Sequence, residues 1–141
     1  LLTWDNTSDL DVILVGPSGD LAAREGLLSA LDTPSTFSGQ VDDDFNGFGP
    51  ESLTASELAP GTYGIAVEVT SSPVSGASPF LRILSRGRLL RVPGVGPRFL
   101  SAERGEVWLA ALLDIGPDGD ARLQLVDRVV QMSPTGPPAL W

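Results

Sequence analysis

An acidic run near the middle of the sequence has the residue types and the spacing that could bind a metal ion. Asp42, Asp44 and Asn46 alternate along it, and Gly47 follows them. This D-x-D-x-N-G spacing lets three side-chain oxygens converge on one hard cation while the glycine turns the chain sharply. Calcium takes about six to eight oxygen ligands, so a short loop dense in carboxylates suits it.

The run begins like an EF-hand loop but does not end like one. An EF-hand has a bidentate glutamate at its twelfth position, where this chain has Leu53, and Glu51 stands at the tenth position. The flanking residues show no helical period. We therefore expect a loop between strands, with its missing ligands supplied from elsewhere. Asp9 and Asp11 are the leading candidates, because residues two apart share one face of a strand.

The sequence thus predicts one calcium ion held by oxygen atoms of six residues. These predicted ligands are Asp9, Asp11, Asp42, Asp44, Asn46 and Glu51. The simpler alternative is a solvated turn, in which Asp and Asn are favoured by loop geometry alone. Two aromatic residues flank the loop, and they either anchor it to the core or stack on a sugar or peptide ligand. They are Phe45 and Phe48.

The composition excludes several classes of function. The chain has 18 acidic residues against 9 arginines and no lysine, giving a net charge of −9. No basic stripe is present, which argues against nucleic-acid binding. Cysteine and histidine are both absent, so disulfides, cysteine nucleophiles, Ser-His-Asp triads and Cys/His metal sites are excluded. Any metal must be held by oxygens. The longest apolar stretch is too short to span a membrane.

Short apolar or alternating runs separated by glycine and proline predict an all-β fold. In 141 residues, 42% of them hydrophobic, they favour one antiparallel β-sandwich, jelly-roll or Ig-like, over residues 1–132. The tail 133–141 is proline-rich and is expected to be extended. Trp4, Tyr63 and Trp108 are expected in the core. The clearest runs are 11–15, 62–70, 80–85, 106–115 and 121–132.

Three further local patterns predict the structure of individual segments. Residues 20–31 contain good helix formers but also Gly26, which predicts a short irregular or helical excursion. Residues 54–57 fit a capping box but are followed by Pro60, so we expect an extended segment there. In the last run the apolar face switches near Asp127, which indicates a bulge or a strand that passes between sheets.

Four short motifs occur in an order that resembles a known family. The first motif is Leu2-Thr3-Trp4, followed by Asp9-Leu10-Asp11-Val12 and Gly16-Pro17-Ser18-Gly19. The second motif is Val41-Asp42-Asp43-Asp44, followed by Gly47-Phe48-Gly49-Pro50-Glu51. The third motif is Pro60-Gly61-Thr62-Tyr63, and the fourth is a late strand that contains Trp108. This order resembles the YfaP-like domains of bacterial exported proteins, over about residues 2–115. The chain departs from their pattern at Ile13-Leu14, where a histidine often follows the first D-x-D, and in the insert-like stretch 21–36.

The resemblance implies a β-sandwich accessory domain, periplasmic or extracellular, that works beside other domains of a parent protein and has no established enzymatic role. Together with the acidic run, it favours a non-catalytic domain whose loop is ordered by calcium. One alternative is a calcium-dependent module that binds carbohydrate or protein. The other is a small glycoside-active enzyme that pairs Asp9 or Asp11 with Asp44 or Glu51, since two carboxylates suffice for that chemistry.

Overall fold

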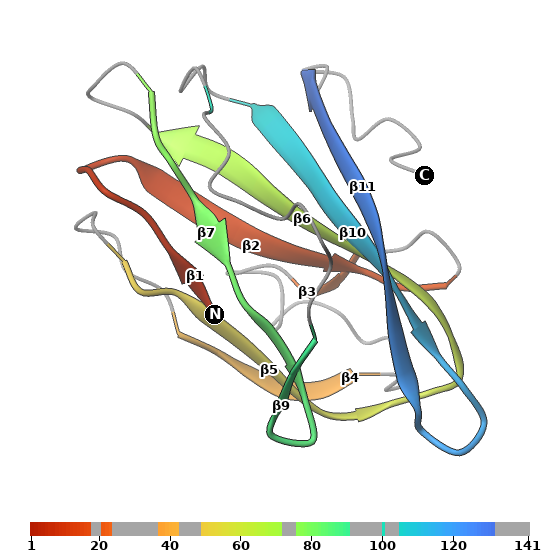
Figure 1. The fold of residues 1–141 in the computed structure, drawn as a ribbon. Helices are drawn as coiled ribbons and strands as arrows, with labels where there is room; N and C mark the ends of the chain where they lie inside the picture. Colours follow the sequence, from red (N-terminus) through yellow and green to blue (C-terminus); the bar gives the residue numbers. More distant parts are fainter. Residues whose placement is uncertain are drawn as a thin grey trace.

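The computed structural model of the chain describes residues 1–17, 21–23, 37–42, 49–71, 76–90, 100 and 105–131. All regular structure in these ranges is β-strand, arranged in antiparallel sheets (Figure 1). The predicted all-β fold is therefore confirmed. Within the same ranges there is no helix with the length and apolarity needed to cross a membrane.

The larger layer is a five-stranded antiparallel sheet. Its strand order is β11–β10–β6–β2–β3. The long central strands supply most of the pairing, and β3 covers only the end of β2, where it pairs with Leu14 and Val15. The strands are β2 (Asp9–Val15), β3 (Leu21–Ala23), β6 (Gly61–Ser71), β10 (Glu106–Ile115) and β11 (Ala121–Gln131).

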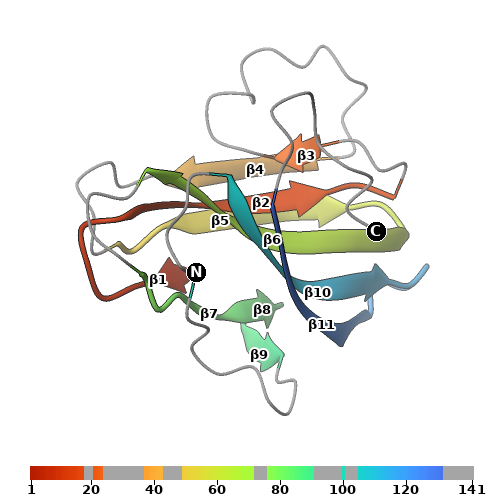
Figure 2. The same cartoon turned by 90° about the horizontal axis from the view of Figure 1, so that it is seen from above.

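The second layer is built from three short strand pairs that cross one face of the large sheet. The pairs are β1 (Leu2–Thr3) with β7 (Phe80–Leu81), β4 (Phe37–Asp42) with β5 (Ser52–Leu58), and β8 (Ile83–Ser85) with β9 (Arg88–Leu90). A bridge between Leu2 and Glu51 joins the first two pairs. Figures 1 and 2 both show β1 lying between β5 and β7.

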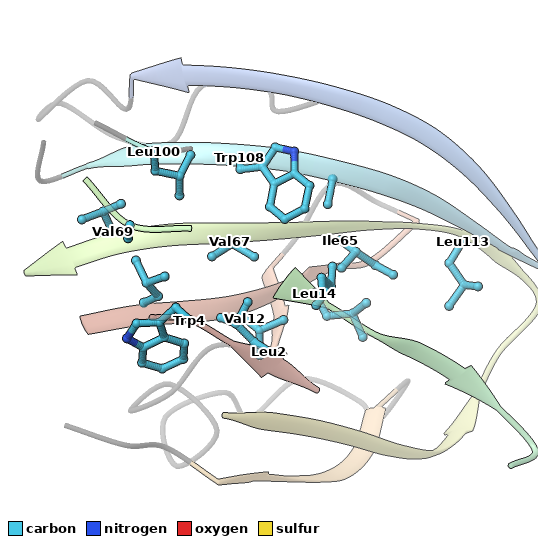
Figure 3. Packing of buried hydrophobic residues seen from close by; sticks show 14 of the residues in the cluster. Leu2, Trp4, Val12, Leu14, Ile65, Val67, Val69, Leu100, Trp108 and Leu113 are labelled. Atoms are coloured by element: carbon cyan, nitrogen blue, oxygen red, sulfur yellow. The ribbon is translucent and has the colours of Figure 1, made fainter. Parts of the chain in front are cut away.

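The main hydrophobic core lies between these two layers. Leu2 of β1 packs against side chains of β2, β6 and β10 (Figure 3). Leu81 of β7 belongs to the same cluster. The three aromatic residues expected in the core are there: Trp4, Tyr63 and Trp108 keep 7%, 0% and 1% of their surface exposed. That part of the sequence-based prediction is confirmed.

A second apolar cluster covers the opposite face of the large sheet. Its buried members are Ile13, Val15, Ala66, Val107 and Leu109. The alternation in 62–70 indicates a strand with one buried face, but β6 is buried on both. The sequence pattern does not predict burial of the second face, because that face has no apolar stripe. Its buried residues are two small ones and an acid: Gly64, Ala66 and Glu68.

The predicted runs match the strands closely, with two differences. Residues 80–85 form two strands, because β7 pairs with β1 whereas β8 pairs with β9. Leu21–Ala23 is a strand at the start of the expected irregular or helical excursion, and the remainder of 20–31 lies outside the described residues. Residues 54–57 are extended within β5, as expected. The tail 133–141 also lies outside the described ranges, so the domain boundary stays a prediction.

The bulge expected near Asp127 is present. The pairing of β10 with β11 moves from Leu109–Arg128 to Ala111–Leu125, so two residues of β11 face one residue of β10. Asp127 has a φ of 50°, a left-handed conformation that aspartate tolerates better than most residues. The Trp108 indole Nε1–H donates to its Oδ1 at 3.1 Å.

Tyr63 gives the fold a distinctive response to alkaline pH. Its ring is 0% exposed, and its hydroxyl donates to the Ala59 carbonyl oxygen at 3.0 Å. Burial raises the pKa of Tyr63 above its ordinary value, because the phenolate is costly to desolvate. The chain has one tyrosine and no lysine, histidine or cysteine, so Tyr63 is the only side chain that titrates near pH 10.

We expect Tyr63→Phe to separate two effects. Near neutral pH the variant loses about 1 kcal/mol of unfolding free energy with its hydrogen bond. Because the folded-state pKa is raised, the stabilisation is complete below the unfolded-state pKa of about 10 and is lost as pH rises through the folded-state pKa. Denaturant unfolding from about pH 8 to about pH 11 should show wild type falling more steeply than Tyr63→Phe. Parallel curves would contradict the raised pKa.

Candidate functional site in the acidic β4–β5 connection

The acidic run is the connection between two paired strands. Asp42 ends β4, Ser52 begins β5, and the two residues are partners in the antiparallel register. The run is therefore closed at both ends by a ladder of backbone hydrogen bonds, and the predicted setting between strands is confirmed. The structure places the two ends of the loop, at Asp42 and at Ser52. The predicted site residues between these ends lie outside the described residues: Asp44, Phe45, Asn46 and Phe48.

Glu51 anchors the end of this connection in the core. Its side chain is 0% exposed. Its backbone N–H donates to the Leu2 carbonyl at 2.9 Å, and its carbonyl accepts from the Leu2 N–H at 2.8 Å. The carboxylate Oε2 accepts a third hydrogen bond, from the Val12 N–H, at 2.9 Å. Together these bonds tie the connection to both layers of the sandwich.

The hydrogen bond to Val12 satisfies a backbone N–H of the large sheet. β3 pairs only with Leu14 and Val15, so no strand among the described residues flanks the earlier part of β2 on that side. A buried backbone N–H that lacks an acceptor destabilises a fold by about 1–3 kcal/mol. The Glu51 carboxylate supplies that acceptor, and a charged acceptor makes a stronger bond than a neutral one.

Gly49 fits the same corner through its lack of a side chain. Its φ is +61°, and a Cβ added to it would lie 3.0 Å from Cζ3 of the Trp4 ring. The ring is held in turn by its indole N–H, which donates to the Ser8 carbonyl at 2.7 Å. The backbone of the connection can approach the ring this closely only where the residue is glycine.

The sequence motifs therefore contact one another in the fold. The Gly49–Glu51 piece packs against Trp4 of the first motif and binds the backbone of Val12. Gly61 of the third motif lies against Pro17, where an added Cβ would come within 2.5 Å of the proline Cγ. These contacts give the motif residues a structural reason to occur together, independent of any metal.

Asp11 lies on the face of β2 that carries the second apolar cluster. In the register it stands opposite Glu68 of β6, and both side chains keep only 6% of their surface exposed. Sequence reasoning did not name Glu68; its one signal was an acid within the alternating apolar run of β6. Asp9 is half-buried, and its carbonyl accepts from the Thr70 hydroxyl at 3.1 Å.

The described acids do not assemble a metal site among themselves. Across the described ranges, no three acidic side chains lie close enough to share an ion. Asp9, Asp11 and Glu51 therefore do not complete a cage with any other described acid, and the predicted calcium site depends on the side chains of the connection itself. Glu51 is also shielded from any substrate in this conformation, because none of its surface is exposed.

Comparison with known proteins gives no relative: no family model, no curated protein and no solved structure matches this chain. The resemblance to YfaP-like domains therefore stays a prediction from the motifs. The structure adds that the motif pieces around Trp4, Val12 and Glu51 meet at one corner of the sandwich.

Proposed function

We propose that this chain is a non-catalytic β-sandwich domain whose acidic β4–β5 connection binds one calcium ion. The observation that carries the proposal is the anchoring of Glu51. Its hydrogen bonds to Leu2 and Val12 hold the C-terminal end of the loop. The loop begins after Asp42, which ends β4 and pairs with Ser52 of β5. A loop held at both ends loses less conformational entropy when its oxygens converge on an ion.

Within this proposal, Asp42, Asp44 and Asn46 supply side-chain oxygens, and Gly47 provides the turn that follows them. Their spacing is that of a calcium loop, and carboxylate and carbonyl oxygens are the ligands that calcium prefers. The ion also offsets part of the mutual repulsion in a chain with a net charge of −9. Its role is to order the loop.

The buried position of Glu51 supports a non-catalytic role. A glycoside-active pair needs two carboxylates that reach the same substrate bond. The Glu51 carboxylate is instead buried in the core, where it accepts a hydrogen bond from the Val12 N–H. We further propose that the domain is an accessory part of an exported protein. That part of the proposal rests on the family resemblance, which places such domains beside others in a parent chain.

Thermal unfolding in calcium, in magnesium and in chelator tests the calcium proposal. We expect calcium to raise the melting temperature, because an ion bound only by the folded state adds about 2.7 kcal/mol at a hundredfold excess over its Kd. Asp44→Ala should abolish this shift. Asp43→Ala is the matched control: it removes the same charge from a position that the D-x-D spacing leaves out of the predicted ligand set, so most of the shift should survive.

Two results would count against the calcium proposal. A melting temperature indifferent to calcium, magnesium and chelator would remove the metal from the function. Equal loss of the shift in Asp43→Ala and Asp44→Ala would mean that calcium responds to the net charge of the loop and not to a set of ligands.

A further inference from the structure

The hairpin β8–β9 carries positive charge in a chain that is otherwise acidic. Residues 69–102 contain five of the nine arginines and no aspartate or glutamate, so all 18 acids lie in the rest of the sequence. The structure describes three of these five arginines, and all three are exposed: Arg82, Arg86 and Arg88. The hairpin and the residue before it are therefore a local cationic surface on an acidic domain.

The contacts of these arginines leave their charge available. The Arg82 guanidinium lies over the Phe80 ring, 4.5 Å from its centroid. Arg86 donates to the backbone carbonyl of Asp118 at 3.0 Å. Neither the ring nor the carbonyl is an anion, so these two contacts orient the guanidinium groups without neutralising them.

Two leucines are exposed on the same hairpin. Leu84 and Leu89 are partners in the antiparallel register and keep 55% and 40% of their surfaces exposed. They are two of the three large apolar side chains that are exposed in the described ranges. The neighbouring pair, Ile83 and Leu90, packs against the main core, so the alternation of a strand places Leu84 and Leu89 on the outer face. Adjacent exposed apolar side chains are typical of a surface that contacts a partner or a membrane.

The position and size of the hairpin favour a membrane surface over other partners. β9 pairs with β8 alone and lies at the outer edge of the second layer (Figures 1 and 2). A small-molecule site is concave, and a stable protein interface buries about 800 Å² on each side. Two strands of 3 residues each at an edge offer neither. A bilayer needs no matching recess, because its headgroups and acyl chains rearrange around an inserted side chain.

We propose that the β8–β9 hairpin docks the domain on the surface of an anionic lipid bilayer. Its arginines lie at the level of the lipid phosphates, and the side chains of Leu84 and Leu89 enter the boundary between headgroups and acyl chains. This contact lies on one face of the membrane and does not cross it.

The acidity of the rest of the chain is compatible with this contact. Charges more than about 10 Å from the lipid are largely screened at 0.1 M salt. Asp118 and Asp120 lie beside the hairpin, in the turn between β10 and β11. Because that turn belongs to the large sheet, these two acids stand on the side of the hairpin opposite to its outer face.

Flotation of the protein with vesicles tests the proposal. One set of vesicles is phosphatidylcholine alone, and the other is phosphatidylcholine mixed with phosphatidylglycerol, which is anionic. Both are used in chelator, so that calcium cannot bridge the acidic β4–β5 connection to the lipid, and the result is independent of the calcium proposal. We expect the protein to float with the mixed vesicles only, and added salt to weaken this binding.

Two double variants divide the binding between charge and apolar contact. Arg82→Gln with Arg88→Gln should weaken binding about 25-fold, because each arginine near an anionic surface contributes about fivefold. Leu84→Ser with Leu89→Ser should weaken it about tenfold or more, because their exposed fractions together amount to about one leucine side chain. All four side chains are exposed, so the melting temperature should stay close to that of wild type.

Two matched controls keep the same chemistry elsewhere or the same surface in place. Arg122→Gln removes an equal charge from an exposed position on β11 and should bind within about twofold of wild type. Leu84→Met keeps an apolar side chain of similar size at the outer face and should also bind like wild type.

Four outcomes would overturn the proposal. The first is no flotation of the wild-type protein with the mixed vesicles. The second is equal flotation with phosphatidylcholine alone, which would remove the role of the arginines. The third is an equal loss in Arg122→Gln and in the variant of Arg82 and Arg88, which would make net charge the cause. The fourth is binding to soluble polyglutamate without binding to vesicles, which would assign the hairpin to an acidic polypeptide.

Discussion

Replacing Glu51 with alanine is expected to lower the free energy of unfolding by about 3 kcal/mol. The change removes a charged acceptor from the Val12 N–H and leaves that buried donor unsatisfied. It also releases the end of the β4–β5 connection from β2, although the backbone bonds with Leu2 remain. Chemical denaturation at neutral pH, followed by tryptophan fluorescence, measures the loss.

Two variants control this prediction. Glu51→Gln keeps an oxygen that accepts from Val12 and should cost about half as much, because the remaining bond has a neutral acceptor. Asp118→Ala removes the same charge from the exposed β10–β11 turn, and its stability should stay within about 0.5 kcal/mol of wild type.

The same experiment in chelator separates the structural role of Glu51 from a ligand role. If Glu51 acts through Val12, alanine destabilises the chain equally with and without calcium. A loss seen only when calcium is present would instead make Glu51 a metal ligand, as the spacing of the acidic run first indicated. The calcium proposal for Asp42, Asp44 and Asn46 survives either result.

Local patterns in the sequence were sufficient to predict the long strands of the large sheet. Alternation and turn residues act over a few neighbours, so the runs that became β2, β6, β10 and β11 could be bounded within about two residues. The turn between β10 and β11 is a direct case. The Gly119 N–H donates to the Gly116 carbonyl at 2.9 Å, and Gly119 has the positive φ that its Pro-x-Gly step indicates.

Contacts between distant residues could not be predicted in the same way. Glu51 and Val12 are separated by 39 residues, and nothing local to either distinguishes a buried acceptor from an exposed metal ligand. The burial of Glu68 opposite Asp11 likewise depends on how β2 pairs with β6. The sequence thus identified the chemical types at the candidate site, and the pairing of strands decided which of them meet.

Trp108 joins the bulge in β11 to the hydrophobic core. Trp108 is 1% exposed, and its indole N–H donates to Asp127 at the bulge. Trp108→Ala is expected to cost about 3–5 kcal/mol, because a large buried ring is lost and the cavity left behind closes only in part. Trp108→Phe keeps most of the apolar contact and should cost about 1–2 kcal/mol, part of it the hydrogen bond.

Variants of Asp127 divide that cost between the hydrogen bond and the backbone. Asp127→Gly loses the bond to Trp108 but suits the φ of 50°, whereas Asp127→Ala loses the bond and also strains the left-handed backbone. Alanine should therefore be less stable than glycine by about 1 kcal/mol. In the Trp108→Phe background the bond is already absent, so Asp127→Gly should cost less there than in wild type. Additive losses in the double variant would mean that Asp127 serves the bulge alone, and that the indole contributes to the core only through its packing.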